Sequence, residues 1–312
     1  MRYFITGGAG FIGSNMVDTL AEMECERITV YDNLTSGKKE FLQGHWGKSY
    51  FHFIEADLLD LATLSKVMAG QEMVFHFASN PDIAKSMTQT DLDLHQGIIA
   101  TYNVLEAMRL EGVKKIVYAS GSGVYGDLGY HETPEDLGPL LPISMYGASK
   151  LGGEGFISAF CHMFDLQAWI FRFANVVGRR QTHGVGFDFI RKLKDNPAEL
   201  LIRGNGTQSK SYIHVDDVIN AVLYCVAHAA DRVNLFNVAT EDYLEVNGIA
   251  RIVMEEMGLA HTRLAYTGGA RGWKGDVPIV RFNLDKIHRL GWRATHDSAA
   301  AMRKSIQEML AG

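Results

Sequence analysis

The turn between the first predicted strand and the first predicted helix places the strictest demand on the fold of this chain. Residues 6–13 read Thr-Gly-Gly-Ala-Gly-Phe-Ile-Gly, so Gly7, Gly10 and Gly13 follow one another at three-residue spacing. Glycine permits a tight turn and a close approach of the backbone to a ligand, and a helix N-terminus offers free N–H groups to an anion. The segment therefore predicts a helix start that binds the pyrophosphate of a dinucleotide.

The hydrophobic pattern of the first half supports this interpretation. Predicted strands span residues 2–6, 27–31, 51–55, 72–77 and 113–119. Predicted helices span residues 11–23, 60–69 and 92–111. The strands are nearly continuous apolar runs, which are typical of parallel strands buried on both faces of a sheet. Their alternation with helices predicts an α/β fold with a doubly wound parallel sheet, the Rossmann arrangement.

The second half is less regular. It begins with a long predicted helix at 144–164 and a strand at 167–173. Shorter helices are predicted near residues 186–195, 215–229, 245–257 and 297–311. We interpret residues 1–174 as a dinucleotide-binding domain and residues 175–312 as a smaller, mixed α/β lobe, with some interleaving of the two.

Two aspartates end predicted strands of the first half. Asp32 follows Gly13 by about 20 residues, where a carboxylate accepts hydrogen bonds from an adenosine ribose and repels a 2′-phosphate. The sequence therefore predicts NAD rather than NADP. Asp57, followed by Leu58, is placed for contacts with adenine, and a role as N-cap of the helix predicted at 60–69 fits it about as well.

Tyr146 and Lys150 lie four residues apart in the helix predicted at 144–164, so they share one face of it. An ammonium group beside a phenol favours the phenolate, which predicts that the pKa of Tyr146 falls below its usual value of about 10. A tyrosine tuned in this way can act as a general base. On spacing alone an unrelated surface pair is the better interpretation, but the dinucleotide-binding pattern upstream reverses the balance and favours a catalytic pair.

Charge and composition exclude several other classes of protein. The net charge of −6 argues against a nucleic-acid partner. The sequence contains no run of 18 or more apolar residues, so we expect no membrane span. The three cysteines are widely separated, which predicts reduced thiols and a cytoplasmic location. His183 and His214 have no neighbouring ligands at the spacing of a metal site, so we expect no metal.

Together these segments resemble the extended short-chain dehydrogenase/reductase family, and within it the nucleotide-sugar epimerases of the UDP-glucose 4-epimerase type. The resemblance covers essentially the whole chain. Its matching segments are Gly7–Gly13, Asp32–Leu34, Asp57–Leu58, His76–Ala78, Ser120–Gly126, Tyr146–Lys150, Arg172–Arg180 and Tyr212–Asp217. It implies bound NAD, a UDP-sugar substrate and a homodimer packed through the helices at 92–111 and 144–164. Burial of the helix at 92–111 against its own sheet is the simpler expectation for its apolar residues.

The resemblance also implies roles for individual residues. Those implied to hold NAD are Gly7, Gly10, Phe11, Ile12, Gly13, Asp32, Asn33, Asp57, Leu58, Phe77, Ala78, Tyr146 and Lys150. Tyr146 is implied to be the catalytic acid and base, with Lys150 tuning it. Those implied to contact the nucleotide sugar are Asn175, Lys210, Arg271 and Asp276. His76 matches a residue near the cofactor, and a hydrogen-bonded core histidine is an equally good interpretation.

One position departs from the family pattern. The family has a serine or threonine three residues before Val124, where a hydroxyl binds the sugar oxygen at the reacting carbon, and this chain has Gly121. Ser120 and Ser122 flank the gap, and we expect Ser122 to replace the missing hydroxyl. The alternative is that both serines only satisfy local backbone groups.

The same segment distinguishes reaction types. Dehydratases of the family carry an Asp-Glu pair directly after that hydroxyl residue, and here Ser122 and Gly123 occupy those positions. The resemblance therefore implies 4-epimerisation of a UDP-sugar through a transient 4-keto intermediate. Three alternatives stay open: a different nucleotide-sugar oxidoreductase on the same scaffold, a 2-epimerase, and a non-catalytic nucleotide-sugar binding protein. Val280, where relatives gate the sugar 2-substituent, leaves N-acetyl sugars open as substrates.

Overall fold

The computed structural model describes residues 1–311, which form two compact units. The first unit comprises residues 1–124, 145–172 and 222–236. The second comprises residues 125–144, 173–221 and the chain from 237 onward. The chain therefore crosses between the units several times. No helix of the described chain is long and apolar enough to cross a membrane.

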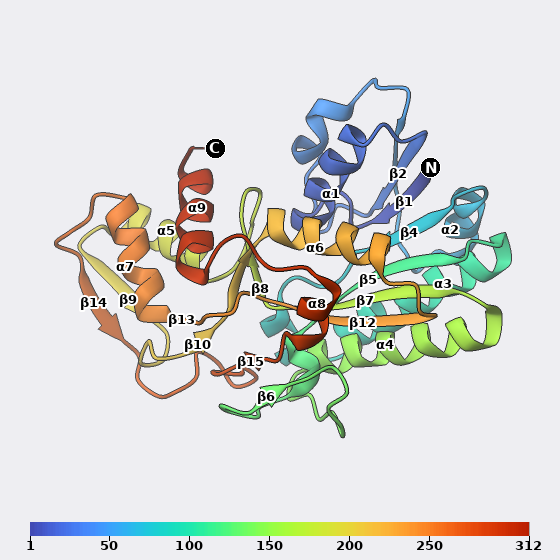
Figure 1. Ribbon diagram of the computed structural model, residues 1–312. Helices are drawn as coiled ribbons and strands as arrows, with labels where there is room; N and C mark the ends of the chain where they lie inside the picture. The colour runs from blue at the N-terminus through green and yellow to red at the C-terminus, as the bar shows by residue number, and fades with distance from the viewer. Residues whose placement is uncertain (312) are drawn as a thin grey trace. The chain divides into compact units, whose positions relative to one another are not determined.

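A seven-stranded sheet forms the centre of the first unit (Figure 1). In spatial order its strands are β12 (Val233–Val238), β7 (Gln167–Phe173), β5 (Lys115–Gly121), β4 (Met73–His76), β1 (Arg2–Thr6), β2 (Arg27–Asp32) and β3 (Phe51–Glu55). The pairs from β3 through β2, β1 and β4 to β5 are all parallel. The chain runs outward from β1 to β3 and then returns to β4 on its other side, which confirms the predicted doubly wound α/β class.

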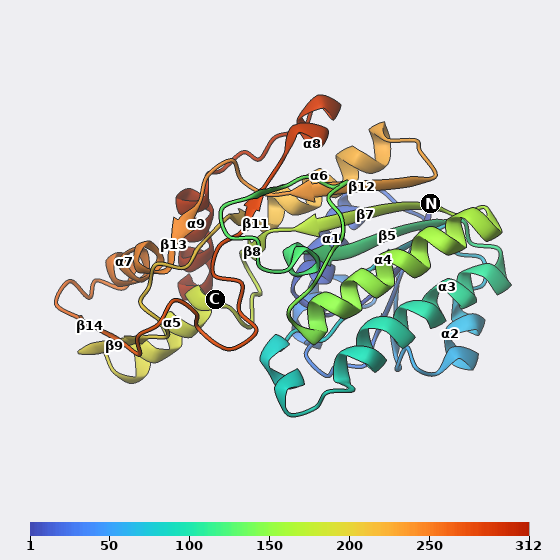
Figure 2. The same ribbon diagram turned by 90° about the horizontal axis from the view of Figure 1, so that it is seen from below.

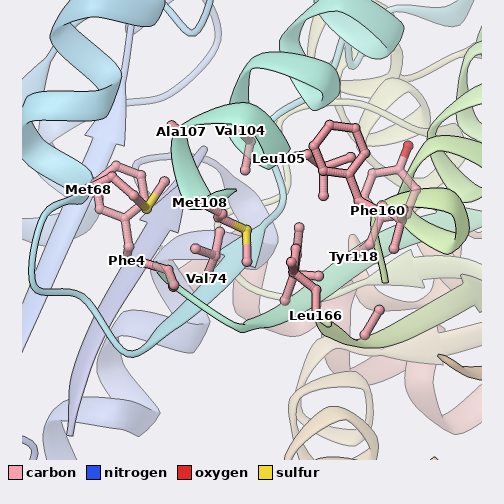
Figure 3. Packing of buried hydrophobic residues seen from close by; sticks show 14 of the residues in the cluster. Phe4, Met68, Val74, Val104, Leu105, Ala107, Met108, Tyr118, Phe160 and Leu166 are labelled. Carbon is pink, nitrogen blue, oxygen red and sulfur yellow. The ribbon is translucent and has the colours of Figure 1, made fainter. Parts of the chain in front are cut away.

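Helices cover the sheet because their apolar faces need a partner. Those of the first unit are α1 (Phe11–Glu22), α2 (Leu61–Met68), α3 (Ala100–Glu111) and α4 (Met145–Phe164), and α6 (Val215–His228) belongs partly to each unit. Helices α2, α3 and α4 lie along one face of the sheet (Figure 2). Figure 3 shows the resulting core, where Val104 and Met108 of α3 pack with Phe4 of β1 and Val74 of β4. Burial of such side chains is the main favourable term for folding.

Most of the observed boundaries in the first unit lie within one residue of the prediction, and two elements differ by more. The strand expected at 113–119 runs from Lys115 to Gly121, because Gly112 (φ +75°) ends α3 and Val113 donates its N–H to the carbonyl of Met108. Val113 therefore belongs to the helix cap. The helix expected at 92–111 begins as a π-helix, η3 (Leu94–Ile99), before α3. Such π turns are rare and often occur at functional sites.

The second unit contains short elements around a separate core. Its strands are β6 (Glu132–Thr133), β8 (Asn175–Val177), β9 (Glu199–Ile202), β10 (Ser209–Lys210), β11 (Tyr212–His214), β13 (Leu244–Glu245), β14 (Arg263–Tyr266) and β15 (Arg281–Phe282). Its helices are α5 (Val185–Asp195), α7 (Val246–Glu256), α8 (Asp285–Leu290) and α9 (Ser298–Ala311). Helices α5, α7 and α9 pack around Phe189, Ile249 and Ile306. The strands form two-stranded pairs, β10 with β13, β11 with β8, β14 with β9 and β15 with β6.

A buried ion pair fixes α4 to the sheet. Arg172 of β7 donates from Nε and Nη2 to the two oxygens of Glu154 at 3.0 and 2.7 Å, and Ser120 of β5 donates to the same carboxylate at 2.5 Å. All three side chains are buried. Because α4 carries Tyr146 and Lys150, this cluster sets the position of the predicted catalytic pair on the sheet.

We predict that Arg172→Leu lowers the free energy of unfolding by about 3–5 kcal/mol, because it leaves the Glu154 carboxylate buried without its cation. Denaturant unfolding followed by circular dichroism measures the loss. Arg109→Leu is the matched control, since Arg109 makes the same two-pronged contact with Glu106 on the exposed face of α3. It should change stability little. Equal losses in the two variants would contradict a dominant role for the buried pair.

Candidate active site

Backbone packing explains why glycine occupies the turn between β1 and α1. Gly7 has a φ of +68°, and a Cβ atom there would lie 2.7 Å from the backbone N of Ala78, which follows β4. At Gly13 a Cβ would lie 2.2 Å from the carbonyl O of Gly7. A side chain at either position would force the elements apart. Phe77 and Ala78, both half-buried, therefore run directly beside the turn.

The start of α1 can hold an anion. Gly10 is its N-cap residue, no side chain caps the helix, and no acidic residue lies in its first turn. Phe11 and Ile12, the first two helical residues, are half-buried rather than enclosed. The free N–H groups and the helix dipole favour a negative group at this end. The residues present thus fit the pyrophosphate of NAD.

Asp32 ends β2 beside this turn. Its Oδ2 accepts the N–H of Ala9 at 2.9 Å, and its Oδ1 accepts the N–H of Leu34 at 2.8 Å. Burial raises the pKa of Asp32, and these two backbone hydrogen bonds oppose the rise. A Cβ atom at Gly37 would lie 2.8 Å from Oδ1 and 2.9 Å from Oδ2, so only glycine leaves space around this carboxylate.

Asp57 and its neighbours form the next part of the site. Asn33 donates to Oδ2 of Asp57 at 2.9 Å, which joins two residues that the resemblance assigns to the cofactor. Asp60, and not Asp57, caps α2 by accepting the N–H of Thr63. The N-cap interpretation of Asp57 was therefore wrong. The side chain of Leu58 is buried in the core of the first unit.

His76 is a hydrogen-bonded core histidine. Its Nδ1 lies 2.7 Å from the hydroxyl of Thr6, and its Nε2 lies 2.9 Å from the hydroxyl of Thr101. Thr101 donates its own proton to the carbonyl of Gly97 at 2.5 Å, so it must accept the Nε2–H of His76. Burial lowers the pKa of His76 to about 3, and the charge of Lys150 acts in the same direction. His76 is thus neutral and links β1 to the π-helix η3.

Lys150 and Tyr146 meet as the helical spacing predicted. The Lys150 ammonium lies 5.5 Å from the centre of the Tyr146 ring and 5.0 Å from that of Tyr118. It donates to the carbonyl of Ala119 in β5 at 2.7 Å. The side chain of Lys150 is only 3% exposed, whereas Tyr146 is half-buried. The pair can therefore offer one phenol to a ligand while its ammonium stays beneath.

The pKa of Tyr146 corrects a prediction. Burial, with a smaller contribution from the negative charge of Asp93, raises it to about 12, so the expected fall was wrong. Loss of solvation is the larger of the two causes. Burial lowers the pKa of Lys150 to about 8, although the carboxylates of Asp93 and Glu154 act in the opposite direction and raise it. A further cation bound beside Tyr146 would favour its phenolate again.

The two serines around Gly121 have different surroundings. The hydroxyl of Ser120 is committed to Glu154. Ser122 begins a short 3-10 turn, η4 (Ser122–Tyr125), is half-buried, and its hydroxyl has no hydrogen-bond partner among residues 1–311. A Cβ atom at the next residue, Gly123, would lie 3.9 Å from the ring of Tyr146. Of the two serines, Ser122 is therefore the one with an uncommitted hydroxyl, and it directly precedes the residue that lies beside the Tyr146 ring.

The predicted substrate residues of the second unit are joined by ion pairs. Lys210 donates to Asp276 at 2.8 Å. Arg271 donates to the carbonyl of Asp276 at 3.0 Å and to the carboxylate of Asp127 at 2.5 Å. Asn175 lies in β8, which pairs with β11. Strand β11 follows β10, the strand of Lys210, in the chain. Asp127 was not predicted, because nothing in its local sequence indicates that it meets residue 271.

One group of side chains has the composition of a metal site. His214 lies 3.1 Å from Glu308 and 3.2 Å from Asp216, so the fold supplies carboxylates that sequence spacing did not indicate. Asp216, however, already pairs with Lys304 at 2.8 Å and with Arg179 at 2.5 Å. These cations and His214 hold the pKa of Asp216 far below its usual range. We interpret the group as an ion-pair network that ties α9 to the start of α6.

Comparisons with known proteins agree with this geometry. The model of the NAD dependent epimerase/dehydratase family matches residues 3–239. A UDP-glucose 4-epimerase of Mycolicibacterium smegmatis is 34% identical over 322 residues, which cover 98% of each chain. A UDP-glucose 4-epimerase of Thermotoga maritima, solved with UDP-glucose, superposes with a TM-score of 0.90 at 30% identity, covering 100% of this chain and 99% of that one.

The UDP-glucose 4-epimerase of Thermus thermophilus, solved with NAD, has a TM-score of 0.88 at 29% identity and covers 100% of both chains. The likeness thus extends over both units. The glycine turn, Asp32 and the Tyr146–Lys150 pair all fall within the matched residues. The chain therefore belongs to the NAD-dependent epimerase/dehydratase family.

Proposed function

We propose that this protein is an NAD-dependent UDP-sugar 4-epimerase that interconverts UDP-glucose and UDP-galactose. The observation that carries the proposal is the pairing of a half-buried Tyr146 with Lys150 beside a segment without acids, Ser122 and Gly123. This set can move one proton and bind one oxygen, but it lacks the Asp-Glu pair that the resemblance associates with loss of water.

The chain's own residues would act on the C4 hydroxyl of the sugar. Tyr146 accepts its proton as a phenolate and returns the proton to the same oxygen later, while Lys150 holds positive charge beneath the ring. Ser122 donates a hydrogen bond to the C4 oxygen. Gly7–Gly13 and Asp32 would hold NAD, which would supply reversible hydride transfer at C4 by way of a transient 4-keto sugar. No net oxidation results.

Binding is divided between two groups of residues. We propose that residues 1–174 supply most contacts to NAD, through Gly7–Gly13, Asp32 and its neighbours. Residues 175–312 would supply those to the nucleotide sugar, namely Asn175, Lys210, Arg271 and Asp276. The support is chemical, because Lys210 and Arg271 offer cations to a pyrophosphate and Asp276 offers acceptors to ribose hydroxyls. Lys210 would act as a point charge and not as a two-pronged donor.

We also propose a cytoplasmic homodimer. The three cysteines are free thiols, as expected in a reducing compartment. On η3, α3 and α4 the side chains of Ile99, Tyr102, Phe156 and Met163 are exposed, Phe156 by 42% and Met163 by 70%. Tyr102 and Phe156 are in contact, with ring centres 6.2 Å apart, so they form a joint apolar surface. A second copy of the same two helices would bury it.

We predict that the wild-type protein converts UDP-glucose into UDP-galactose without net use of NADH, as NMR of the C4 stereochemistry across a panel of nucleotide sugars would show. Tyr146→Phe should lower kcat by about 10²–10⁴-fold while NAD still co-purifies. Tyr266→Phe, an exposed tyrosine of β14, is the control. Net NADH consumption would instead indicate a reductase, and binding without isomerisation a non-catalytic protein.

Ser122→Ala should lower kcat by about 10²-fold, because it removes a donor to the reacting oxygen. Ser122→Thr should keep most of the activity, since it keeps the hydroxyl. Ser120→Ala is the positional control and should mainly lower the melting temperature, because Ser120 serves Glu154. The same epimerase assay measures kcat for all three variants. An unchanged rate in Ser122→Ala would remove Ser122 from the mechanism.

Phe156→Glu should convert the dimer into a monomer, because it places a charge in the centre of the proposed interface. Light scattering coupled to gel filtration measures the mass. Leu141→Glu, at a side chain that is 71% exposed in the second unit, should leave the dimer intact. A dimer that persists in Phe156→Glu, or a monomeric wild type, would refute this interface.

A further inference from the structure

Asp93 is a buried carboxylate that the reaction scheme does not use. It directly precedes η3 and is only 1% exposed. Its Oδ1 accepts a hydrogen bond from Nδ2 of Asn80 at 3.0 Å. Its Oδ2 is buried with no hydrogen-bond partner in the described chain. Burying a carboxylate oxygen without a donor is unfavourable, so the retention of this one requires an explanation.

Asn80 holds Asp93 in a fixed orientation. The Nδ2 group of Asn80 also donates to the carbonyl of Asp82 at 2.9 Å, and its Oδ1 accepts the N–H of Asp82 at 3.0 Å. The amide is therefore bound on both sides and cannot turn freely. Because one oxygen of Asp93 is tethered to this rigid group, the other oxygen is held in one place.

The π-helix brings Asp93 to the catalytic pair. Helix η3 packs against α4, and a Cβ atom at Gly97 would lie 2.5 Å from the hydroxyl of Ser149. Ser149 lies between Tyr146 and Lys150 in the chain and donates to the carbonyl of Tyr146 at 2.8 Å. The charge of Asp93, at the start of η3, acts on both members of the pair, raising the pKa of Tyr146 and that of Lys150.

Asp93 differs from the other carboxylate that acts on Lys150. Glu154 is neutralised by the two-pronged contact with Arg172. Among residues 1–311 no lysine, arginine or histidine lies within ion-pair distance of Asp93. Its negative charge is therefore uncompensated by a direct partner, and it acts over a low-dielectric interior on Lys150 and Tyr146. The ammonium of Lys150 donates to the carbonyl of Ala119, which carries no net charge.

We propose that Asp93 is a positioning residue of the epimerase site, whose tethered carboxylate fixes the charge state of the Tyr146–Lys150 pair. This inference rests on the proposed function and deepens it. Burial alone favours a neutral amine at Lys150, and the nearby negative charge keeps the ammonium that Tyr146 needs. The same charge holds the proton on Tyr146 until a ligand changes the balance. The groups that face the pair are Asp93, Glu154 with Arg172, Tyr118 and neutral His76.

Asp93→Asn tests the proposal with little change of shape, because the new amide oxygen can still accept from Asn80. Loss of the negative charge disfavours the ammonium of Lys150 and favours the phenolate of Tyr146. Both apparent pKa values of the pair should therefore fall, and the pH profile of kcat/KM should move to lower pH by about 1 unit. Absorbance of the phenolate, taken as the difference from the matching Tyr146→Phe protein, should show the same fall without any turnover.

Two variants separate charge from structure. Asp91→Asn removes a carboxylate that is 71% exposed just before η3, and it should leave the profile in place. Asn80→Ala breaks the tether but keeps the carboxylate, so it should lower the melting temperature and leave the phenolate titration nearer to wild type than Asp93→Asn does. Unshifted titrations in Asp93→Asn would overturn the proposal, as would an equal shift in either of these variants.

The phenolate measurement keeps this proposal distinct from the proposed function. If wild type epimerises no nucleotide sugar, the function fails, but the titration of Tyr146 still reports on Asp93. If wild type is an active epimerase and the Asp93→Asn titration matches it, the function stands and the role of Asp93 fails.

Discussion

The buried ammonium of Lys150 is the constraint on which the rest of the site depends. A charge removed from water needs polar partners, and here they are the Ala119 carbonyl and two aromatic ring faces, with the Asp93 carboxylate within electrostatic reach. The Ala119 carbonyl and the Tyr118 ring belong to β5, the Tyr146 ring to α4 and Asp93 to the segment before η3, so the ammonium joins these three parts of the first unit. The same charge helps to keep His76 neutral. The proposed proton-transfer site is thus also a structural centre of the first unit.

The cofactor half of the site depends on backbone and not on side chains. Gly7 and Gly13 are required because the turn, β4 and α1 approach within distances that leave no space for a Cβ atom. That closeness leaves the first N–H groups of α1 uncapped at the edge of the sheet. The hydrogen-bond chain from Thr6 through His76 and Thr101 to Gly97 then connects this turn to the π-helix. The turn proposed to hold the cofactor is therefore joined to the same π-helix that packs against α4, the helix of Tyr146 and Lys150.

Local chemistry explains what the sequence could predict. The glycine turn, Asp32 and the Tyr146–Lys150 spacing each depend on a few neighbouring residues, and the structure places them as expected. What it could not predict depends on contacts between distant segments. The tether of Asp93 to Asn80 and the pairing of Arg271 with Asp127 arise only in the folded chain. The predicted direction of the Tyr146 pKa shift was wrong for the same reason. Burial is a property of the folded chain, and it decides the direction of this shift.

Charge pairing in the second unit would limit how strongly the proposed substrate residues could hold an anionic ligand. Lys210 and Arg271 are already bonded to Asp276 and Asp127, so a phosphate that binds either cation replaces a carboxylate and gains only the difference between them. Once released from Lys210, the Asp276 carboxylate can accept hydrogen bonds from the hydroxyl groups of a ribose. Such an exchange gives specificity for a nucleotide with less net affinity than free cations would give. Moderate binding suits the proposed reaction, in which the keto sugar must rotate to present its other face while its nucleotide stays bound.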